Sequence, residues 1–167
     1  TSRRSFLKTS AALGAAAALP SFSMRAAANK NSVVRMLHIG VGGIGGMQRG
    51  QLKSHKKVEF AFLCDVDSNP LKNIGRQFPK AKQFTDYREV FEKHLNEFDA
   101  VIVDTPDHHH APMMTRALAA GNHGYGQKPL VHQLDELRMI REVLAKRPEL
   151  YTQMGNQRAC GTGRMQA

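Results

Sequence analysis

The sequence of 167 residues predicts an α/β fold with a doubly wound parallel sheet of the Rossmann type. From Val33 onward, short apolar runs alternate with longer segments of helical periodicity, which is typical of right-handed βαβ units. A glycine-rich loop directly follows the first apolar run, and an acidic residue ends the second. The length allows one ordinary domain, and 41% hydrophobic residues are enough for a packed core.

The elements follow in order along the chain. The first strand is expected at 34–39, where an apolar run enters the glycine loop. Asp86 is placed to cap the third helix, and Gly121 to terminate the fourth. If the sheet has the doubly wound order, its strands lie as 3-2-1-4-5-6. The other strands are expected at 58–64, 83–84, 100–104, 123–125 and 150–154, and the helices at 44–54, 70–78, 87–94, 112–120 and 134–146.

The glycine loop has the pattern G-x-G-x-x-G between the first strand and the first helix. In this pattern Gly40 permits the tight turn, Gly42 lets the backbone approach a pyrophosphate, and Gly45 lets the helix pack on the strand. The helix N-terminus adds free N–H groups and partial positive charge for the phosphates. Glycine costs a helix about 1 kcal/mol relative to alanine, so a merely flexible loop explains the composition poorly. We therefore predict a dinucleotide site that includes Gly40, Gly42, Gly43, Ile44 and Gly45.

Asp65 ends the second strand 20 residues after Gly45, which is the spacing of the dinucleotide fingerprint. Its carboxylate is expected to accept hydrogen bonds from the adenosine ribose and to repel a 2′-phosphate, which favours NAD over NADP. Lys72 and Arg76 lie one or two helical turns further on and could still reach a 2′-phosphate. NADP therefore stays open as an alternative cofactor.

The first 28 residues are expected to be an export signal. Ser2-Arg3-Arg4-Ser5-Phe6-Leu7-Lys8 is a twin-arginine pattern, and the apolar run at 11–19 is too short for a mature membrane-spanning helix. Three alanines at 26–28 offer small residues to a signal peptidase. We therefore expect a twin-arginine signal peptide at 1–28, read by the twin-arginine export machinery, and a dinucleotide-binding domain at 29–167. The protein is then periplasmic or otherwise exported.

The positive charge does not indicate nucleic-acid binding. The chain has 24 Lys and Arg against 14 Asp and Glu, but four of the basic residues lie in the signal, which leaves 20 against 14. The densest remaining run, Lys53, Lys56 and Lys57, has no interleaved aromatic residues for base stacking. We expect a solvated basic face and no nucleic-acid partner.

Cysteine and histidine usage excludes disulfide and metal frameworks. Two cysteines cannot build a disulfide framework or a four-Cys zinc site. In the expected strand order, Cys64 and Cys160 lie about 19 Å apart, so both should be free thiols. The three histidines at 108–110 suggest a metal, but neighbouring side chains on a regular backbone diverge, and no metal site is expected. His38 is expected to be structural or exposed, and Met113 and Met114 to pack.

Two further segments carry a family resemblance. Thr105-Pro106-Asp107-His108-His109-His110 and Gln127-Lys128-Pro129-Leu130, together with the glycine loop and Cys64-Asp65-Val66-Asp67, resemble the glucose–fructose oxidoreductase/inositol dehydrogenase (Gfo/Idh/MocA) family. The likeness runs from about Val33 to the last residue, and exported members with twin-arginine leaders look most similar. It implies an NAD(P)-dependent oxidoreductase that transfers hydride between the nicotinamide and a small-molecule carbohydrate, a sugar or polyol.

The resemblance also implies roles for single residues. Lys128 and His110 are the catalytic candidates, the lysine near the reacting carbon and the histidine facing the cleft. Thr105 and Pro106 are expected to contact the cofactor, and Asn156 of the later Met154-Gly155-Asn156-Gln157 segment joins the cofactor-binding set. Gln127 stands where the family has glutamate, so Lys128 lacks an adjacent carboxylate.

Family enzymes have a second α/β domain that carries substrate contacts, whereas this chain stops at Ala167. We therefore expect an amino-terminal fragment that is inactive alone and that forms a homo-oligomer only with the missing domain. Two other functions stay open. One is an NAD-dependent glycoside hydrolase of the same family, in which the cofactor oxidises the sugar transiently and is regenerated. The other is a non-catalytic dinucleotide-binding fragment.

Overall fold

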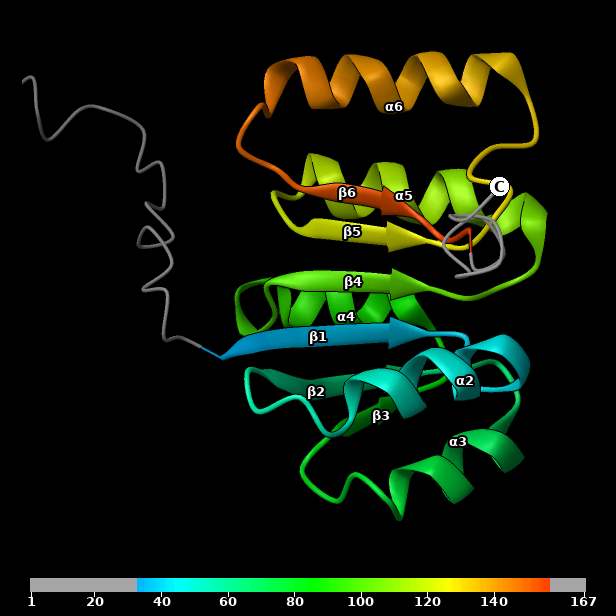
Figure 1. Ribbon diagram of the computed structural model, residues 1–167, viewed down its shortest axis with the longest axis vertical. Coiled ribbons are helices and arrows are strands. Elements are labelled where there is room, and N and C mark those ends of the chain that lie inside the picture. The colour runs from blue at the N-terminus through cyan, green and yellow to red at the C-terminus, as the bar shows by residue number, and fades with distance from the viewer. Residues whose placement is uncertain (1–32, 157–167) are drawn as a thin grey trace, which may run out of the picture. The chain divides into compact units, whose positions relative to one another are not determined.

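A six-stranded sheet organises residues 33–156, which are the residues that the computed structural model describes (Figure 1). The strand order is β3-β2-β1-β4-β5-β6, and every neighbouring pair is parallel. This confirms the doubly wound fold class and the expected order. The signal segment at 1–28 and Cys160 lie outside the described residues.

Strands and helices alternate as predicted, with shifts at some ends. The strands are β1 (Val34–Ile39), β2 (Val58–Cys64), β3 (Lys82–Phe84), β4 (Ala100–Val103), β5 (His123–Gly126) and β6 (Thr152–Met154). The helices are α2 (Gly43–Leu52), α3 (Ser68–Gly75), α4 (Tyr87–Lys93), α5 (His110–Ala119) and α6 (Leu134–Lys146), with single 3-10 turns η1 (Leu95–Glu97) and η2 (Asp107–His109). None of the helices in this described part is long and apolar enough to cross a membrane.

Local chemistry sets the helix ends. Asp86 caps α4, its side chain accepting a hydrogen bond from the Arg88 amide at 2.9 Å, and Gly121 follows α5 with φ +86°, both as predicted. Helices α3 and α5 each begin two residues before the proline that was expected to open them. Proline is tolerated throughout the first turn, where its missing N–H has no intrahelical partner.

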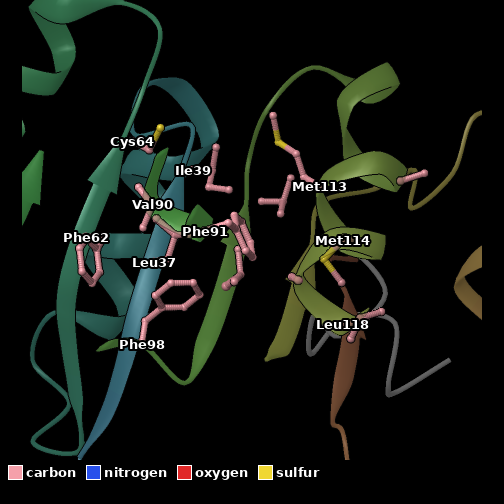
Figure 2. Close-up of a cluster of buried hydrophobic side chains, with 14 of the residues drawn as sticks. Leu37, Ile39, Phe62, Cys64, Val90, Phe91, Phe98, Met113, Met114 and Leu118 are labelled. Atoms are coloured by element: carbon pink, nitrogen blue, oxygen red, sulfur yellow. The ribbon is translucent and has the colours of Figure 1, made fainter. Parts of the chain in front are cut away.

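Helices cover both faces of the sheet, and each face has its own apolar core (Figure 1). Helices α2 and α3 lie over one face, where Leu71 packs with Met36 and Phe60. Helices α4, α5 and α6 belong to the other face, whose larger core is shown in Figure 2. Strand β4 lies between these layers and is buried along its whole length. Because all neighbouring strands are parallel, their carboxyl ends all lie at one edge of the sheet.

Candidate dinucleotide-binding site

A cavity of about 600 Å³ lies at the carboxyl edge of the sheet, where the segments after β1, β2, β3 and β4 meet. This volume is within the range of small-molecule sites, and the edge is where ligands bind in open α/β sheets. Seven of the residues predicted from the sequence to bind the cofactor line this one cavity: Gly40, Gly42, Gly43, Ile44, Asp65, Thr105 and Pro106.

The three pattern glycines have different surroundings. At Gly40, where φ is +85°, a Cβ would lie 2.5 Å from the carbonyl oxygen of Asp104, so the loop passes directly over the end of β4. A Cβ at Gly45 would overlap the carbonyl oxygen of Gly40, which is the close helix–strand packing expected there. A Cβ at Gly42 would have nothing nearer than 4.0 Å. The fold itself requires Gly40 and Gly45, whereas the space beside Gly42 is left open.

The N-terminus of α2 opens toward this space. Its N-cap is Gly42, which has no side chain to cap the helix, and its first turn contains no acidic residue. The positive end of the helix dipole is therefore not neutralised within the helix. Gly42, Gly43 and Ile44 all line the cavity. Open space, backbone amides and partial positive charge fit a pyrophosphate.

Asp65 lies at the end of β2 across from the glycine loop. One carboxylate oxygen, Oδ2, accepts hydrogen bonds from the Val41 amide at 2.9 Å and the Gly42 amide at 3.3 Å. The other, Oδ1, accepts one from the Asp67 amide at 3.0 Å. The side chain is half-buried and lines the cavity. Backbone amides thus fix this carboxylate at the position where a ribose would be read.

We expect Asp65→Ala to reduce the preference for NAD over NADP by about tenfold or more, because a carboxylate beside a 2′-phosphate is a like-charge contact. Titration of both dinucleotides by calorimetry checks this. Asp67→Ala is the matched control, since Asp67 is exposed and its side chain caps α3 through the Asn69 amide. It should lower stability by about 1 kcal/mol and leave the preference unchanged. An unchanged preference in Asp65→Ala would mean that another group reads the ribose.

The far wall of the cavity comes from the β3–α4 connection, which sequence reasoning did not include in the site. Thr85, Asp86, Tyr87 and Arg88 all line the cavity there. The Arg88 guanidinium pairs with Asp86, Nη1 to Oδ2 at 3.1 Å, and its central carbon lies 5.3 Å from the centre of the Tyr87 ring. The sequence did contain one indication of this wall. If β3 is parallel to β1 and β2, it must end at the same edge, so the residues that follow it lie at the site.

Only one of the three consecutive histidines points away from the others. The ring centres of His108 and His109 lie 4.0 Å apart, contrary to the expected divergence of neighbouring side chains, and His109 lines the cavity. Burial is the main cause that lowers the pKa of His109, with smaller contributions from nearby positive groups, first His108 and then Arg88. His110 points elsewhere. Among the described residues, no group of three His, Cys, Asp or Glu side chains could hold a metal ion.

His110 is fully buried and does not face the cleft, which corrects the expectation from the sequence. Its Nδ1 lies 2.6 Å from the carbonyl oxygen of Pro129, and its Nε2 lies 2.7 Å from that of Thr105. The reason is its position as the first residue of α5, where its side chain turns inward between two loops. His110 therefore links the turn after β4 to the turn after β5.

Lys128 and Asn156 lie after β5 and β6 and are not among the cavity-lining residues. Both side chains are exposed. Gln127 is buried beside Lys128, and its Oε1 accepts a hydrogen bond from the Lys128 amide at 2.9 Å. Lys128 follows β5, which pairs with β4, the strand that leads to Thr105 and Pro106. Asn156 follows β6, one strand further out.

The inner end of the cavity is apolar. Ile39, Cys64 and Met113 line it and also belong to the larger core, where Figure 2 shows them at one end of the cluster. Burial raises the pKa of the Cys64 thiol to about 12, and the nearby carboxylates of Asp65, Asp86 and Glu89 act in the same direction. The thiol is therefore uncharged at neutral pH. Met113 packs as predicted, although it also forms part of the cavity surface.

Fold and site together define a dinucleotide-binding Rossmann domain, and comparison with known proteins identifies its family. Residues 34–154 match the model of the oxidoreductase family with an NAD-binding Rossmann fold, GFO_IDH_MocA. The chain belongs to this Gfo/Idh/MocA family. Residues 1–20 match the twin-arginine translocation signal, so the chain carries the signal for export through that pathway.

Curated relatives include glycoside hydrolases. A glycosyl hydrolase family 109 protein of Shewanella pealeana is 33% identical over 161 residues, which cover 80% of this chain and 35% of the relative. An alpha-N-acetylgalactosaminidase of Tannerella forsythia is 31% identical over 143 residues, covering 71% of this chain and 31% of the relative. The chain thus spans about a third of the length of these relatives.

Solved structures with the same fold include dehydrogenases. Myo-inositol 2-dehydrogenase from Lactobacillus plantarum matches with a TM-score of 0.72 and 23% identity, covering 78% of this chain and 38% of that one. The WlbA dehydrogenase from Chromobacterium violaceum, in complex with NADH and UDP-GlcNAcA, matches with a TM-score of 0.74 and 20% identity. The match covers 82% of this chain and 39% of that one. At these identities the likeness supports the fold.

Proposed function

We propose that this chain binds NAD in the cavity at the carboxyl edge and forms the cofactor-binding part, residues 29–167, of a two-domain oxidoreductase. The whole enzyme would transfer hydride between the nicotinamide and a sugar or polyol. When bound, NAD would supply the hydride acceptor. The observation that carries the proposal is the open space beside Gly42 at the uncapped N-terminus of α2, with the fixed Asp65 carboxylate opposite.

The lining residues divide this cavity into regions for the parts of a dinucleotide. The glycine loop would hold the pyrophosphate through backbone amides, and Asp65 would accept hydrogen bonds from the adenosine ribose. Thr105 and Pro106 would contact the nicotinamide half, and Asn156, which follows β6, is a further proposed contact. Asp65 makes NAD the expected cofactor rather than NADP. Arg88, the arginine that lines the cavity, is paired with Asp86.

Lys128 is the proposed catalytic residue because it lies at the end of β5, beside the turn that would hold the nicotinamide. Its exposed side chain can approach a substrate that another part of the protein holds over this edge. There the amine, in its neutral form, would accept the proton of a substrate hydroxyl as hydride leaves the carbon that bears this hydroxyl. His110 would act as a positioning residue, since it holds the two turns together from within.

A second candidate is an NAD-dependent glycoside hydrolase, favoured by the names and identities of the family 109 relatives. It would use the same cavity and the same Lys128. The overall reaction would differ: after transient oxidation of the sugar the aglycone would be eliminated, water would add in its place, and the hydride would return to the sugar. The reaction leaves no net change in cofactor redox state.

The test uses the whole protein with a panel of sugars, polyols and aryl glycosides. We follow absorbance of reduced cofactor and, separately, release of the aglycone. Reduction of added NAD that depends on a sugar or polyol supports the oxidoreductase. Aglycone release with bound NAD and no accumulation of NADH supports the hydrolase instead. NAD binding with neither reaction would leave a non-catalytic dinucleotide-binding protein and overturn both enzymatic proposals.

A further inference from the structure

A buried arginine lies beneath the glycine loop, outside the cavity. Arg49 of α2 is only 4% exposed, and its Nη1 donates a hydrogen bond to the carbonyl oxygen of Val41 at 3.0 Å, with a longer contact to that of Gly45 at 3.4 Å. Burial lowers the pKa of this guanidinium, and the Asp104 carboxylate opposes that effect. Burying a charged group is unfavourable unless it is paired and hydrogen-bonded, so its contact with the loop calls for an explanation.

The contact fixes one peptide unit of the loop. In a trans peptide the C=O and N–H groups point in opposite directions. Arg49 holds the oxygen of the Val41–Gly42 peptide, and the N–H of the same peptide points to Asp65 Oδ2, 3.3 Å away at the cavity. Rotation of this peptide would exchange the directions of its C=O and N–H groups. Gly42 has no Cβ that would oppose this rotation. The rotated peptide would present a carbonyl oxygen to a phosphate.

Two more buried side chains, Asp104 and His38, lie beneath the glycine loop. Asp104 directly follows β4 with a fully buried side chain, and its Oδ2 lies 3.0 Å from Nε2 of His38 on β1. His38 is fully buried as well, and a Cβ at Gly45 would lie 2.9 Å from its Nε2. The Asp104 carboxylate thus compensates the arginine electrostatically and contacts β1 through His38. Three elements, β1, α2 and the end of β4, each contribute one charged or titratable side chain beneath the loop.

We propose that Arg49 is a positioning residue of the NAD site, which holds the Val41–Gly42 peptide with its N–H toward the cavity. The glycine loop then has its phosphate-binding shape before the cofactor arrives, and binding does not require the loop to reorder. The inference rests on the proposed binding of NAD in this cavity. In this proposal Arg49 contributes to cofactor affinity without contacting the cofactor.

The experiment compares four forms of the full chain by calorimetry with two probes, NAD and adenosine. Arg49→Met removes the guanidinium and keeps an unbranched apolar side chain, while Arg49→Lys keeps the charge without the planar fork. Arg141→Met is the matched control, because Arg141 is exposed on α6. Adenosine has no phosphate and tests the Asp65 end of the cavity separately. Thermal unfolding of each form measures stability.

We expect Arg49→Met to bind NAD about tenfold or more weakly, as loss of a charge-assisted hydrogen bond predicts. The loss for adenosine should be smaller, because Asp65 keeps its hydrogen bonds from the Val41 and Asp67 amides. Arg49→Lys should lie between this variant and the wild type, and Arg141→Met should match the wild type. Wild-type NAD affinity in Arg49→Met would overturn the inference, as would an equal loss for NAD and adenosine. If Arg49→Met does not fold, wild-type NAD affinity in Arg49→Lys would overturn it. A wild-type chain that binds no NAD would instead overturn the proposed function.

Discussion

Replacing Gly42 with valine is expected to weaken NAD binding by more than about 100-fold and to leave the fold intact. The backbone at Gly42 is extended, with φ −79° and ψ −179°, a conformation that valine adopts readily. A Cβ there would have only two ordinary contacts, at 4.0 Å, with Asp65 Oδ2 and Pro70 Cβ. The added side chain would nevertheless occupy the space that the pyrophosphate needs. Calorimetry and thermal unfolding of the same samples measure affinity and stability.

Gly50→Val is the matched control for this substitution. Gly50 lies in α2, which Gly42 precedes as the N-cap; it is exposed, and a Cβ placed on it would have no atom within 4 Å. This variant should bind NAD as the wild type does. Wild-type NAD affinity in Gly42→Val would contradict the assignment of the glycine loop to the pyrophosphate. A large fall in unfolding temperature in Gly42→Val alone would show that the space beside Gly42 is needed by the fold.

Lys128→Ala is expected to reduce kcat of the whole protein by about 10²–10⁴-fold, the usual contribution of a general acid or base. NAD affinity should stay the same, because Lys128 lies after β5, whereas the pyrophosphate and ribose are proposed to bind at the turns after β1 and β2. The His110 contacts with the carbonyl oxygens of Thr105 and Pro129 would hold the turn that carries Lys128 beside the proposed nicotinamide end. Steady-state kinetics with the substrate found in the panel, and NAD titration, provide the measurement.

Lys146→Ala, at the exposed end of α6, is the control for the loss of a surface charge. It should leave kcat and KM unchanged. The pH profile adds a second readout, since a lysine that exchanges a proton should contribute an ionisation to kcat that disappears in Lys128→Ala. Unimpaired turnover by Lys128→Ala would remove the lysine from the mechanism and leave the NAD site unaffected.

Local sequence patterns were sufficient to predict most of the fold. β1 and β2 have the predicted bounds because each is an apolar run that ends at a glycine or an aspartate, and α6 has them because Gln133 and Glu136 form a capping box at its start. The strand order followed from the doubly wound pattern. Errors arose at α3 and α5, where proline was treated as the first helical residue although it occupies a later place in the first turn.

The candidate site was only partly predictable, because two of its features depend on packing between distant segments. Arg49 reads in the sequence as a surface residue of a polar helix, and its burial arises only when α2 lies on β1 and the end of β4. His110 was placed in the cleft by its motif, but its orientation depends on the Pro129 carbonyl 19 residues away. Motif spacing identifies the backbone segments of a site, whereas tertiary contacts decide which side chains reach it.

The thiol at the inner end of the cavity is chemically protected. Because burial raises its pKa to about 12, the Cys64 thiol stays protonated at neutral pH, and only the thiolate reacts readily with oxidants and disulfides. We therefore expect Cys64 to react slowly with oxidants in the compartment to which the protein is exported. The same protection makes Cys64 an internal reporter of opening: once Cys160 is replaced by serine, the rate of alkylation measures how often the apolar core beneath the cavity is exposed to solvent.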